Sequence, residues 1–479
     1  MNIQIQHADV HLIDLRTRLP AKYGIVTMTG APHAFIRTQV EVDGRVHSGI
    51  AADNLPPKWF KKDLRQALDE ETDEMLRVIE HAVSASVGMK GSSAFDVWKK
   101  LDAVQQDWGR AYNLPSLLSN FGTALVERAL VEAICKSLGS PFARAVGSSA
   151  MGIRLGEMDK RLVGFQPADL LPRQPRQRVI ARHTVGMADP LTDDDISADN
   201  RLNDGLPQSL AEYIQRYGLK HFKIKISGDV GQDRDRLQRT ADVVDKHVTT
   251  SAAITFDGNE HFLSLPEFRE YWAQLTETAA LQPLLARLLF VEQPFHRDVA
   301  LDRDVLSELN RWSDCPKLII DESDAEQDSL ARALELGYHG KGFKNCKGVF
   351  RGVAGACLLE KLRRDSPDSS FLLSGEDLAN VGPVGLMQDL AVAASLGIES
   401  IERNGHHFFA GLSAFPQSVQ QQVLQHHGDL YDRSHIGWPT VRIERGELNL
   451  QSVNAAPLGV GFELDVEQFQ EASRWRQTT

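Results

Sequence analysis

The stretch HFKIKISGD, residues 221–229, places two lysines inside what otherwise has the pattern of a buried strand. Phe222, Ile224 and Ile226 alternate with Lys223 and Lys225. Because side chains alternate between the two faces of a strand, both lysines must point to the same side. Two interpretations follow: a surface strand with a solvated lysine face, or a strand that delivers two ammonium groups into a site.

The pattern around this stretch indicates an α/β barrel. From residue 178 onward, short apolar runs alternate with amphipathic helical stretches. Eight such runs, each followed by a helix or turn, predict a TIM-type (β/α)₈ barrel over residues 178–410. Helices are expected at 233–248, 265–275, 301–312, 353–365 and 385–397.

The rest of the chain predicts an α+β capping domain. Residues 7–19 and 33–51 alternate apolar and polar side chains, as half-buried antiparallel strands do. A loop is expected between them at 21–32, and three helices at 63–86, 93–109 and 119–139. We expect residues 1–140 to form this domain, 141–177 to connect it to the barrel, and 411–479 to pack back on it.

Charged side chains end the predicted barrel strands. Asp257, Glu292 and Asp321 close three consecutive apolar runs. The carboxyl ends of barrel strands converge on one mouth, so three carboxylates would meet there. A single acid after a strand is usually a helix cap or a solvated turn, but three neighbouring carboxylates repel one another unless they share a cation. Hard oxygen ligands on a rigid ring suit Mg²⁺.

The lysines fit the same mouth. An unpaired buried ammonium group is costly, and nearby carboxylates would offset that cost for Lys223. Lys225 lies nearer the mouth and is a candidate base. Lys344 closes the sixth run, roughly across the ring, so Lys225 and Lys344 could take and return a proton from opposite sides of a substrate carboxylate. Lys347 is interpreted as a loop lysine.

Composition excludes several other functions. The net charge is -12 and the pI is about 5.8, so binding to nucleic acid or to an anionic membrane is not expected. The first residues show neither a basic nor an apolar segment of a signal peptide, and no run approaches the roughly 18 apolar residues of a membrane span. The four cysteines are scattered without a CxxC pair, which predicts reduced thiols and a cytoplasmic protein.

The motifs KIK, DGN, EQP, DES and FKNCKG, in this order and spacing, resemble the enolase superfamily, and within it the mandelate racemase/muconate lactonizing enzyme branch. The resemblance implies an enolase-like modified barrel, a homo-oligomer (a dimer or larger), and Mg²⁺, with Mn²⁺ as the alternative ion. It implies metal ligands at Asp257, Glu292 and Asp321. It makes Lys225 and Lys344 the acid/base pair, and has Lys223 bind the substrate carboxylate or tune Lys225.

Further side chains are candidates for contacts with substrate or for auxiliary roles. Asn259 matches the asparagine that follows the first ligand in the family. Positions near the predicted mouth or in the cap loop add the remaining candidates, which are His183, Glu376, Asp377, Glu402, Tyr23 and Thr29. The seventh run ends in SGED, so the histidine of the racemase subgroup is missing there.

The leading hypothesis is therefore a Mg²⁺-dependent isomerase or lyase that removes the α-proton of a small carboxylate. Racemisation, epimerisation, cycloisomerisation and elimination share this step, and all remain open. One alternative is an acid-sugar dehydratase, with Glu376 or a histidine assisting the leaving group. Another is an inactive barrel that serves as a binding or scaffold protein, against which the intact lysines and acids argue.

Overall fold

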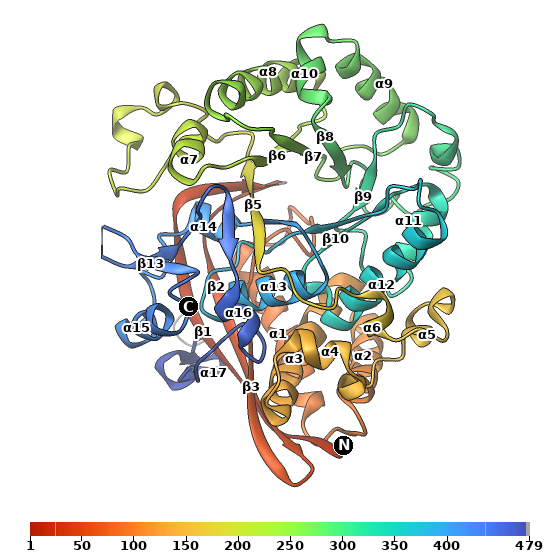
Figure 1. Cartoon of the computed structure of the whole chain (residues 1–479), viewed down its shortest axis with the longest axis vertical. Coiled ribbons are helices and arrows are strands. Elements are labelled where there is room, and N and C mark those ends of the chain that lie inside the picture. Colours follow the sequence, from red (N-terminus) through yellow and green to blue (C-terminus); the bar gives the residue numbers. More distant parts are fainter. Residues whose placement is uncertain (24, 436, 476–479) are drawn as a thin grey trace.

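The computed structural model describes residues 1–23, 25–435 and 437–475, with the backbone alone for Tyr23. Its two parts are a closed parallel barrel and an antiparallel sheet with helices beside it (Figure 1). The predicted barrel and cap are both present. No helix of the described part is long and apolar enough to cross a membrane.

Eight parallel strands form the barrel, and pairing of the last strand with the first closes it. Each strand is short, and its apolar side chains alternate between the barrel interior and the surrounding helices. In sequence order they are β5 (Arg178–Val185), β6 (His221–Lys225), β7 (Ala253–Asp257), β8 (Leu288–Glu292), β9 (Leu318–Ile320), β10 (Gly340–Phe343), β11 (Leu372–Gly375) and β12 (Ser400–Glu402).

Helices follow most of these strands and cover the outside of the barrel (Figure 1). They are α7 (Leu210–Tyr217), α8 (Val230–His247), α9 (Leu265–Thr276), α10 (Gln282–Leu285), α11 (Ser329–Leu336), α12 (Val349–Asp365), α13 (Val384–Ser395) and α14 (Asn404–Phe408).

The prediction of a helix at residues 301–312 is wrong. That segment forms turns, with one 3₁₀ turn at Leu309–Arg311. The Asp302 carboxylate accepts hydrogen bonds from the backbone N–H groups of Asp304 (2.8 Å) and Val305 (3.2 Å). These bonds are those of a helix N-cap, but after one helical turn, closed by the bond from Leu306 N–H to Asp302 O (3.1 Å), the segment continues in turns.

The capping domain is built on three long antiparallel strands. They are β1 (Ile3–Tyr23), β2 (Val26–Val42) and β3 (Arg45–Asn54), and the short β4 (Lys90–Gly91) pairs with β1. The helices are α1 (Leu68–Ser86), α2 (Ala94–Ala111) and α3 (Ser116–Leu138). Gly139 ends α3 with a φ of 56°, the left-handed conformation that glycine commonly adopts after a helix.

The prediction of a loop at residues 21–32 is wrong as well. The two strands stay paired almost to their tip, with Ala21 opposite Met28 and Lys22 opposite Thr27. The pairing continues because the residues between Val26 and Ala31 retain a strand-like alternation of buried and exposed side chains. A long hairpin therefore reaches toward the barrel mouth in place of a loop.

The connection and the C-terminal segment contain short elements. Residues 141–177 hold α4 (Phe142–Gly147), α5 (Leu155–Met158) and α6 (Pro167–Leu170). The C-terminal segment holds α15 (Gln417–His426), β13 (Tyr431–Arg433), β14 (Pro439–Val441), β15 (Glu447–Asn449), α16 (Gln451–Ala455), β16 (Gln470–Glu471) and α17 (Ala472–Trp475). β16 pairs with β1 of the cap as expected, but β15 pairs antiparallel with β5, so this segment contacts both domains.

Helix α3 fixes the cap to the barrel. Nearly all of its residues are buried, including charged ones. Its Glu127 carboxylate accepts hydrogen bonds from the backbone N–H groups of Val349 (3.0 Å) and Phe350 (2.7 Å), at the start of α12. A carboxylate at a helix N-terminus satisfies donors that have no partner within the helix.

Candidate active site

The two lysines of β6 point into the barrel. Phe222 and Ile224 are fully buried on the helix side, and Lys223 and Lys225 line a pocket at the mouth of the barrel. Alternation along the strand forces this arrangement. The interpretation of these lysines as a solvated surface face is therefore wrong.

Lys223 lies at the centre of a cluster of carboxylates. Its Nζ is 2.9 Å from Asp257 Oδ2 and 2.8 Å from one oxygen each of Glu292, Glu376 and Glu402. Burial alone would lower the pKa of Lys223, but these four carboxylates outweigh burial and raise it well above its usual value. Lys223 is thus held as an ammonium group that neutralises its neighbours.

Three carboxylates stand on adjacent strands, as the sequence predicted. Asp257 and Glu292 end β7 and β8 and lie opposite each other in the strand register. Asp321 directly follows β9. All three are buried, at 1–2% exposure, so each needs a cationic partner.

Lysines supply those partners. Asp257 Oδ2 lies 2.5 Å from Lys225 Nζ. Asp321 forms ion pairs with Lys344 and, at 2.7 Å, with Lys347. Burial would raise the pKa of Asp321, but Lys344 and Lys347 lower it to about 2.

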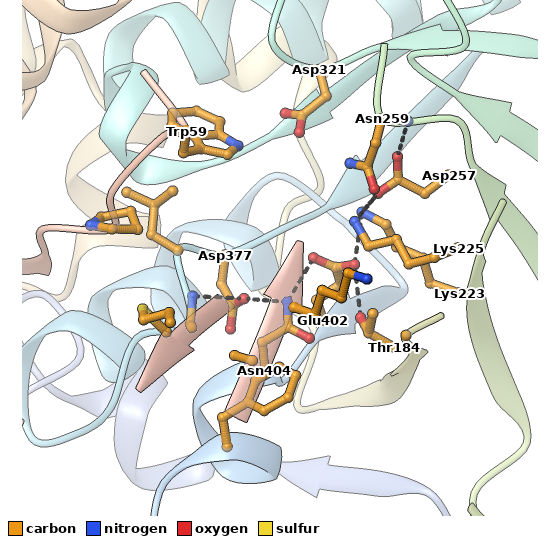
Figure 2. Close-up of a pocket in the computed structure, with 18 of the residues that line it drawn as sticks. Trp59, Thr184, Lys223, Lys225, Asp257, Asn259, Asp321, Asp377, Glu402 and Asn404 are labelled. Carbon is orange, nitrogen blue, oxygen red and sulfur yellow. Dashed lines mark hydrogen bonds and ion pairs between the residues drawn. The ribbon is translucent and has the colours of Figure 1, made fainter. Parts of the chain in front are cut away.

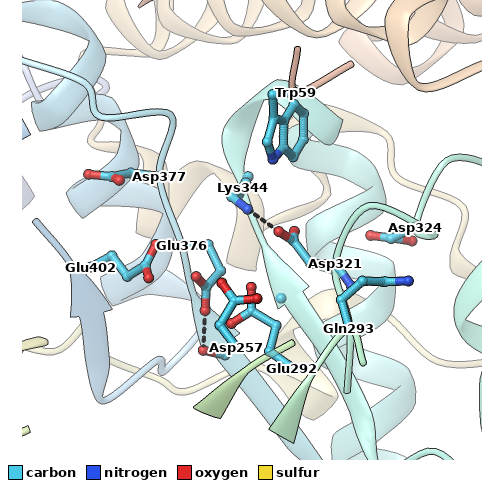
Figure 3. Close-up of polar contacts among 12 residues, drawn as sticks. Trp59, Asp257, Glu292, Gln293, Asp321, Asp324, Lys344, Glu376, Asp377 and Glu402 are labelled. Atoms are coloured by element: carbon cyan, nitrogen blue, oxygen red, sulfur yellow. Dashed lines mark hydrogen bonds and ion pairs between the residues drawn. The ribbon is translucent and has the colours of Figure 1, made fainter. Parts of the chain in front are cut away.

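Glu292 differs from its two neighbours. Burial and the nearby Glu376 raise the pKa of Glu292 well above its usual value, and its Oε2 has no hydrogen-bond partner within the described chain. Figure 3 shows Glu292 and Glu376 turned toward the same space as Asp257. An unpartnered buried oxygen beside two further carboxylates is a donor set that suits a hard divalent cation.

The carboxylates are not assembled as a metal site in this structure. Among the described residues, no group of three or more histidine, cysteine, aspartate or glutamate side chains converges closely enough to hold a metal ion. The lysines occupy the oxygens that a cation would need. The residue types and their positions on neighbouring strands nevertheless fit Mg²⁺, which Asp257, Glu292 and Asp321 would hold.

A pocket lies above these carboxylates. Figure 2 shows that the labelled lining side chains point into it from the barrel strands and from the cap. Lys225 and Lys344 both line it. Its cap side carries Ala21, Lys22, Met28, Pro56, Lys58, Trp59 and Lys62, and its far barrel side carries Asp377, Leu378, Ala379, Glu402, Asn404 and Phe408.

Several auxiliary candidates lie at this pocket. Asn259 lines it, and its backbone N–H donates to Asp257 Oδ1 at 2.9 Å. Asp377 and Glu402 line it too, and Asn404 Nδ2 donates to both, at 3.0 and 3.1 Å. Burial and the adjacent Glu376 raise the pKa of Glu402 to about 7.

Glu376 lies beneath the pocket and does not line it. Its carboxylate is bound by Lys223, by Ser374 Oγ at 2.6 Å and by the guanidinium of Arg182. The pKa of Glu376 is held well below its usual value, because Lys223 and Arg182 outweigh the effect of burial. Glu376 therefore orients Lys223 and is not placed to assist a leaving group.

Two residues predicted to contact the substrate, His183 and Thr29, do not line the pocket. Arg182 and Thr184 of β5 face the interior, so His183 between them points outward, where its ring packs 4.6 Å from Tyr213 and 4.7 Å from His407. Thr29 is exposed on β2, and its neighbour Met28 lines the pocket instead, again through strand alternation. The side chain of Tyr23 lies outside the described part of the chain.

Sequence reasoning missed three contributors. Lys347, interpreted as a loop lysine, is 2% exposed and donates to the backbone oxygens of Asp321 (2.7 Å) and Gly342 (3.0 Å) as well as to the Asp321 carboxylate. Its place within the FKNCKG motif was the available signal. Trp59 and Lys62 line the pocket from the cap. Residues 49–60, which include Trp59, resemble a cap loop of the family, but neither side chain was named as a site residue.

Comparison with known proteins agrees with this architecture. No family model and no curated protein matches the chain. Solved structures match over nearly its whole length. Muconate lactonizing enzyme from Pseudomonas fluorescens, complexed with muconolactone, is 16% identical with a TM-score of 0.59, over 97% of this chain and 98% of that one.

Two further structures carry ligands. A dipeptide epimerase from Enterococcus faecalis, complexed with Mg and L-Leu-L-Tyr, is 15% identical with a TM-score of 0.58, over 95% of this chain and 99% of that one. An enolase from Bradyrhizobium, complexed with magnesium and mandelic acid, is 13% identical with a TM-score of 0.57, over 98% and 99%. The chain thus has the fold of mandelate racemase/muconate lactonizing enzyme-like proteins of the enolase superfamily, as the motifs predicted.

Proposed function

We propose that the protein is a Mg²⁺-dependent isomerase or lyase of the enolase superfamily that removes the proton α to a carboxylate. The observation that carries the proposal is the placement of Lys225 and Lys344. They line one pocket from β6 and from the end of β10, four strands apart in an eight-stranded ring. Two amines in that relation can reach opposite faces of one carbon atom.

Each lysine has a defined part in the step. A neutral amine takes the α-proton, and the electron pair of the C–H bond remains on the substrate as an enediolate. The opposite ammonium group can return a proton to the other face, which inverts the carbon. Lys223 keeps the carboxylates beneath the pocket neutralised. Mg²⁺, when bound, would stabilise the negative charge that develops on the substrate carboxylate.

Support for Mg²⁺ comes from two sources. Asp257, Glu292 and Asp321 are buried oxygen ligands on adjacent strands. Two of the similar structures hold magnesium, and one of them also holds a small carboxylic acid, mandelic acid. A carboxylate substrate suits a pocket that the ammonium groups of Lys225 and Lys344 line.

The dehydratase alternative has less support. Glu376 is occupied by Lys223 and Arg182, and no histidine lines the pocket among the described residues. The groups proposed to assist a leaving hydroxyl are therefore not in position. The inactive scaffold remains the functional alternative that the experiment must exclude.

Deuterium incorporation tests the proposal. The protein is incubated with Mg²⁺ in D₂O and a panel of acids that includes both enantiomers of mandelate and of N-acetylphenylalanine, together with sugar acids and lactones. We expect α-deuteration of at least one acid. Lys225→Ala and Lys344→Ala should each abolish it for one of the two enantiomers, and the exposed control Lys246→Ala should keep it for both. Loss of one water from a sugar acid would favour a dehydratase. A bound but unchanged acid would favour the scaffold.

A further inference from the structure

The indole of Trp59, a cap residue, lies against the candidate acid/base of the barrel. Lys344 Nζ is 4.8 Å from the ring centroid of Trp59. Figure 3 shows the ring on one side of the ammonium group and Asp321 on the other. Trp59 is 8% exposed and lines the pocket. Lys225, by contrast, has no aromatic partner in the described structure.

The loop that carries Trp59 is held in a strained conformation. Lys58, the preceding residue, has a φ of 60°, a backbone conformation that residues other than glycine rarely adopt. Glu71 of α1 holds it there, by accepting from the Lys58 backbone N–H at 2.8 Å and pairing with its Nζ at 3.0 Å. Lys58 Nζ also donates to the carbonyl oxygens of Asp63 (2.9 Å) and Gln66 (2.6 Å). Strain of this kind persists where the surroundings fix it, often at functional sites.

The barrel fixes the same loop from the other side. Arg297 donates to the carbonyl oxygens of Trp59 (3.0 Å) and Phe60 (2.9 Å). Glu260 binds the Arg297 guanidinium through two bonds, at 2.7 and 2.8 Å. Phe60 also packs on Phe121 of α3, with ring centroids 4.6 Å apart. Both domains therefore determine where the indole lies.

We propose that Trp59 is a positioning residue for Lys344, which holds its ammonium group toward the substrate on one face of the pocket. The proposal rests on the proposed function. A lysine has a flexible four-carbon stem and three donors. Mg²⁺ would compete with Lys344 for Asp321, but the contact with the indole face does not depend on that carboxylate. The indole covers one side of the ammonium group and leaves the side toward the pocket open.

The proton step on this face is specific to Lys344. Its neutral amine takes the α-proton from one enantiomer, the electron pair of the broken C–H bond stays on the substrate, and the ammonium formed returns a proton to the same carbon. A displaced Lys344 slows this transfer and leaves the transfer to Lys225 intact. A side chain that only bounds the substrate pocket would affect proton transfer on both faces of the substrate equally.

The test compares the two enantiomers of each acid that the wild-type protein exchanges in D₂O, starting from the mandelates and the N-acetylphenylalanines. The Lys344→Ala variant identifies the enantiomer whose proton Lys344 removes. We expect Trp59→Leu to slow exchange of that enantiomer at least tenfold, with the other within twofold and KM unchanged. Trp59→Phe, which keeps an aromatic face, should restore part of the lost rate.

Phe408→Leu is the matched control, because Phe408 borders the same pocket and is likewise 8% exposed. It should change both enantiomers by a similar factor. Circular dichroism and Mg²⁺ binding of each variant verify folding. Equal slowing of both enantiomers by Trp59→Leu, or a change confined to KM, would overturn the positioning role. Absence of exchange in the wild-type protein would overturn the proposed function, and this inference with it.

Discussion

Lys225 Nζ lies 2.5 Å from Oδ2 of Asp257, so the candidate base is ion-paired to a candidate metal ligand. The same oxygen lies 2.9 Å from Lys223 Nζ. An oxygen that serves two ammonium groups cannot also hold a divalent cation without repulsion between the positive charges. The lysine and the metal ion therefore compete for Asp257, and metal binding would release Lys225 toward the substrate.

This competition predicts opposite effects of two substitutions on Mg²⁺ affinity, measured by titration calorimetry. Asp257→Asn should weaken binding at least tenfold because it removes a charged ligand. Lys225→Met should strengthen binding by about tenfold, or about 1.4 kcal/mol, because it removes the competitor. Asp298→Asn, on the exposed surface, is the control and should leave the affinity unchanged. Weaker binding in Lys225→Met would contradict the competition.

Lys223 and Lys225 should differ in their effect on stability. Lys223→Met leaves four buried carboxylates without their shared cation, so we expect the free energy of unfolding in urea to fall by about 3–5 kcal/mol. Lys225→Met removes one partner of Asp257, which retains Lys223, so its loss should be much smaller. Similar losses for the two variants would show that the carboxylate cluster does not depend on Lys223.

Glu127 should make stability depend on pH. Burial raises its pKa from an ordinary 4.5 to about 7, in spite of two backbone N–H donors. A raised acid pKa means that the folded state binds the proton more tightly. The stabilisation from Glu127 is therefore complete below about pH 4.5 and is lost as the pH rises to about 7, a change of about 3 kcal/mol.

The Glu127→Gln variant tests this pH dependence. Its free energy of unfolding, relative to the wild-type protein, should increase between pH 4.5 and 7.5. Glu467→Gln, an exposed acid of the C-terminal segment, is the control and should follow the wild-type curve closely. Parallel curves for Glu127→Gln and the wild-type protein would show that Glu127 does not titrate in this range.

The barrel and the site charges were predictable because they depend on local patterns. Strand alternation places Lys223 and Lys225 on one face, and each barrel strand ends at the mouth, so Asp257, Glu292 and Asp321 fall on adjacent strands. These rules need only neighbouring residues along the chain. The same rule of alternation, applied to Arg182 and Thr184, would have turned His183 outward.

Contacts between distant segments were not predictable. Trp59 reaches Lys344 only because Glu71 and Arg297 hold its loop, and no local pattern links these residues. The helix expected at residues 301–312 does not form even though Asp302 makes the bonds of a helix N-cap. A capped start and an amphipathic pattern were therefore not sufficient to predict a helix here.

The connection between β5 and α7, here called the insertion (residues 192–207), should depend on one arginine of the cap. Arg18 of β1 pairs with Asp204 through two bonds, at 2.7 and 2.9 Å, and also donates to Tyr213 Oη at 3.2 Å. Its side chain is 5% exposed, so Arg18→Ala leaves the half-buried Asp204 carboxylate and the buried Tyr213 hydroxyl without this donor. We expect faster amide hydrogen exchange in residues 192–207 and in the adjoining β1–β2 hairpin, with exchange in the barrel strands unchanged. The exposed control Arg16→Ala should exchange like the wild-type protein, and unchanged protection of the insertion in Arg18→Ala would mean that its other contacts suffice to hold it.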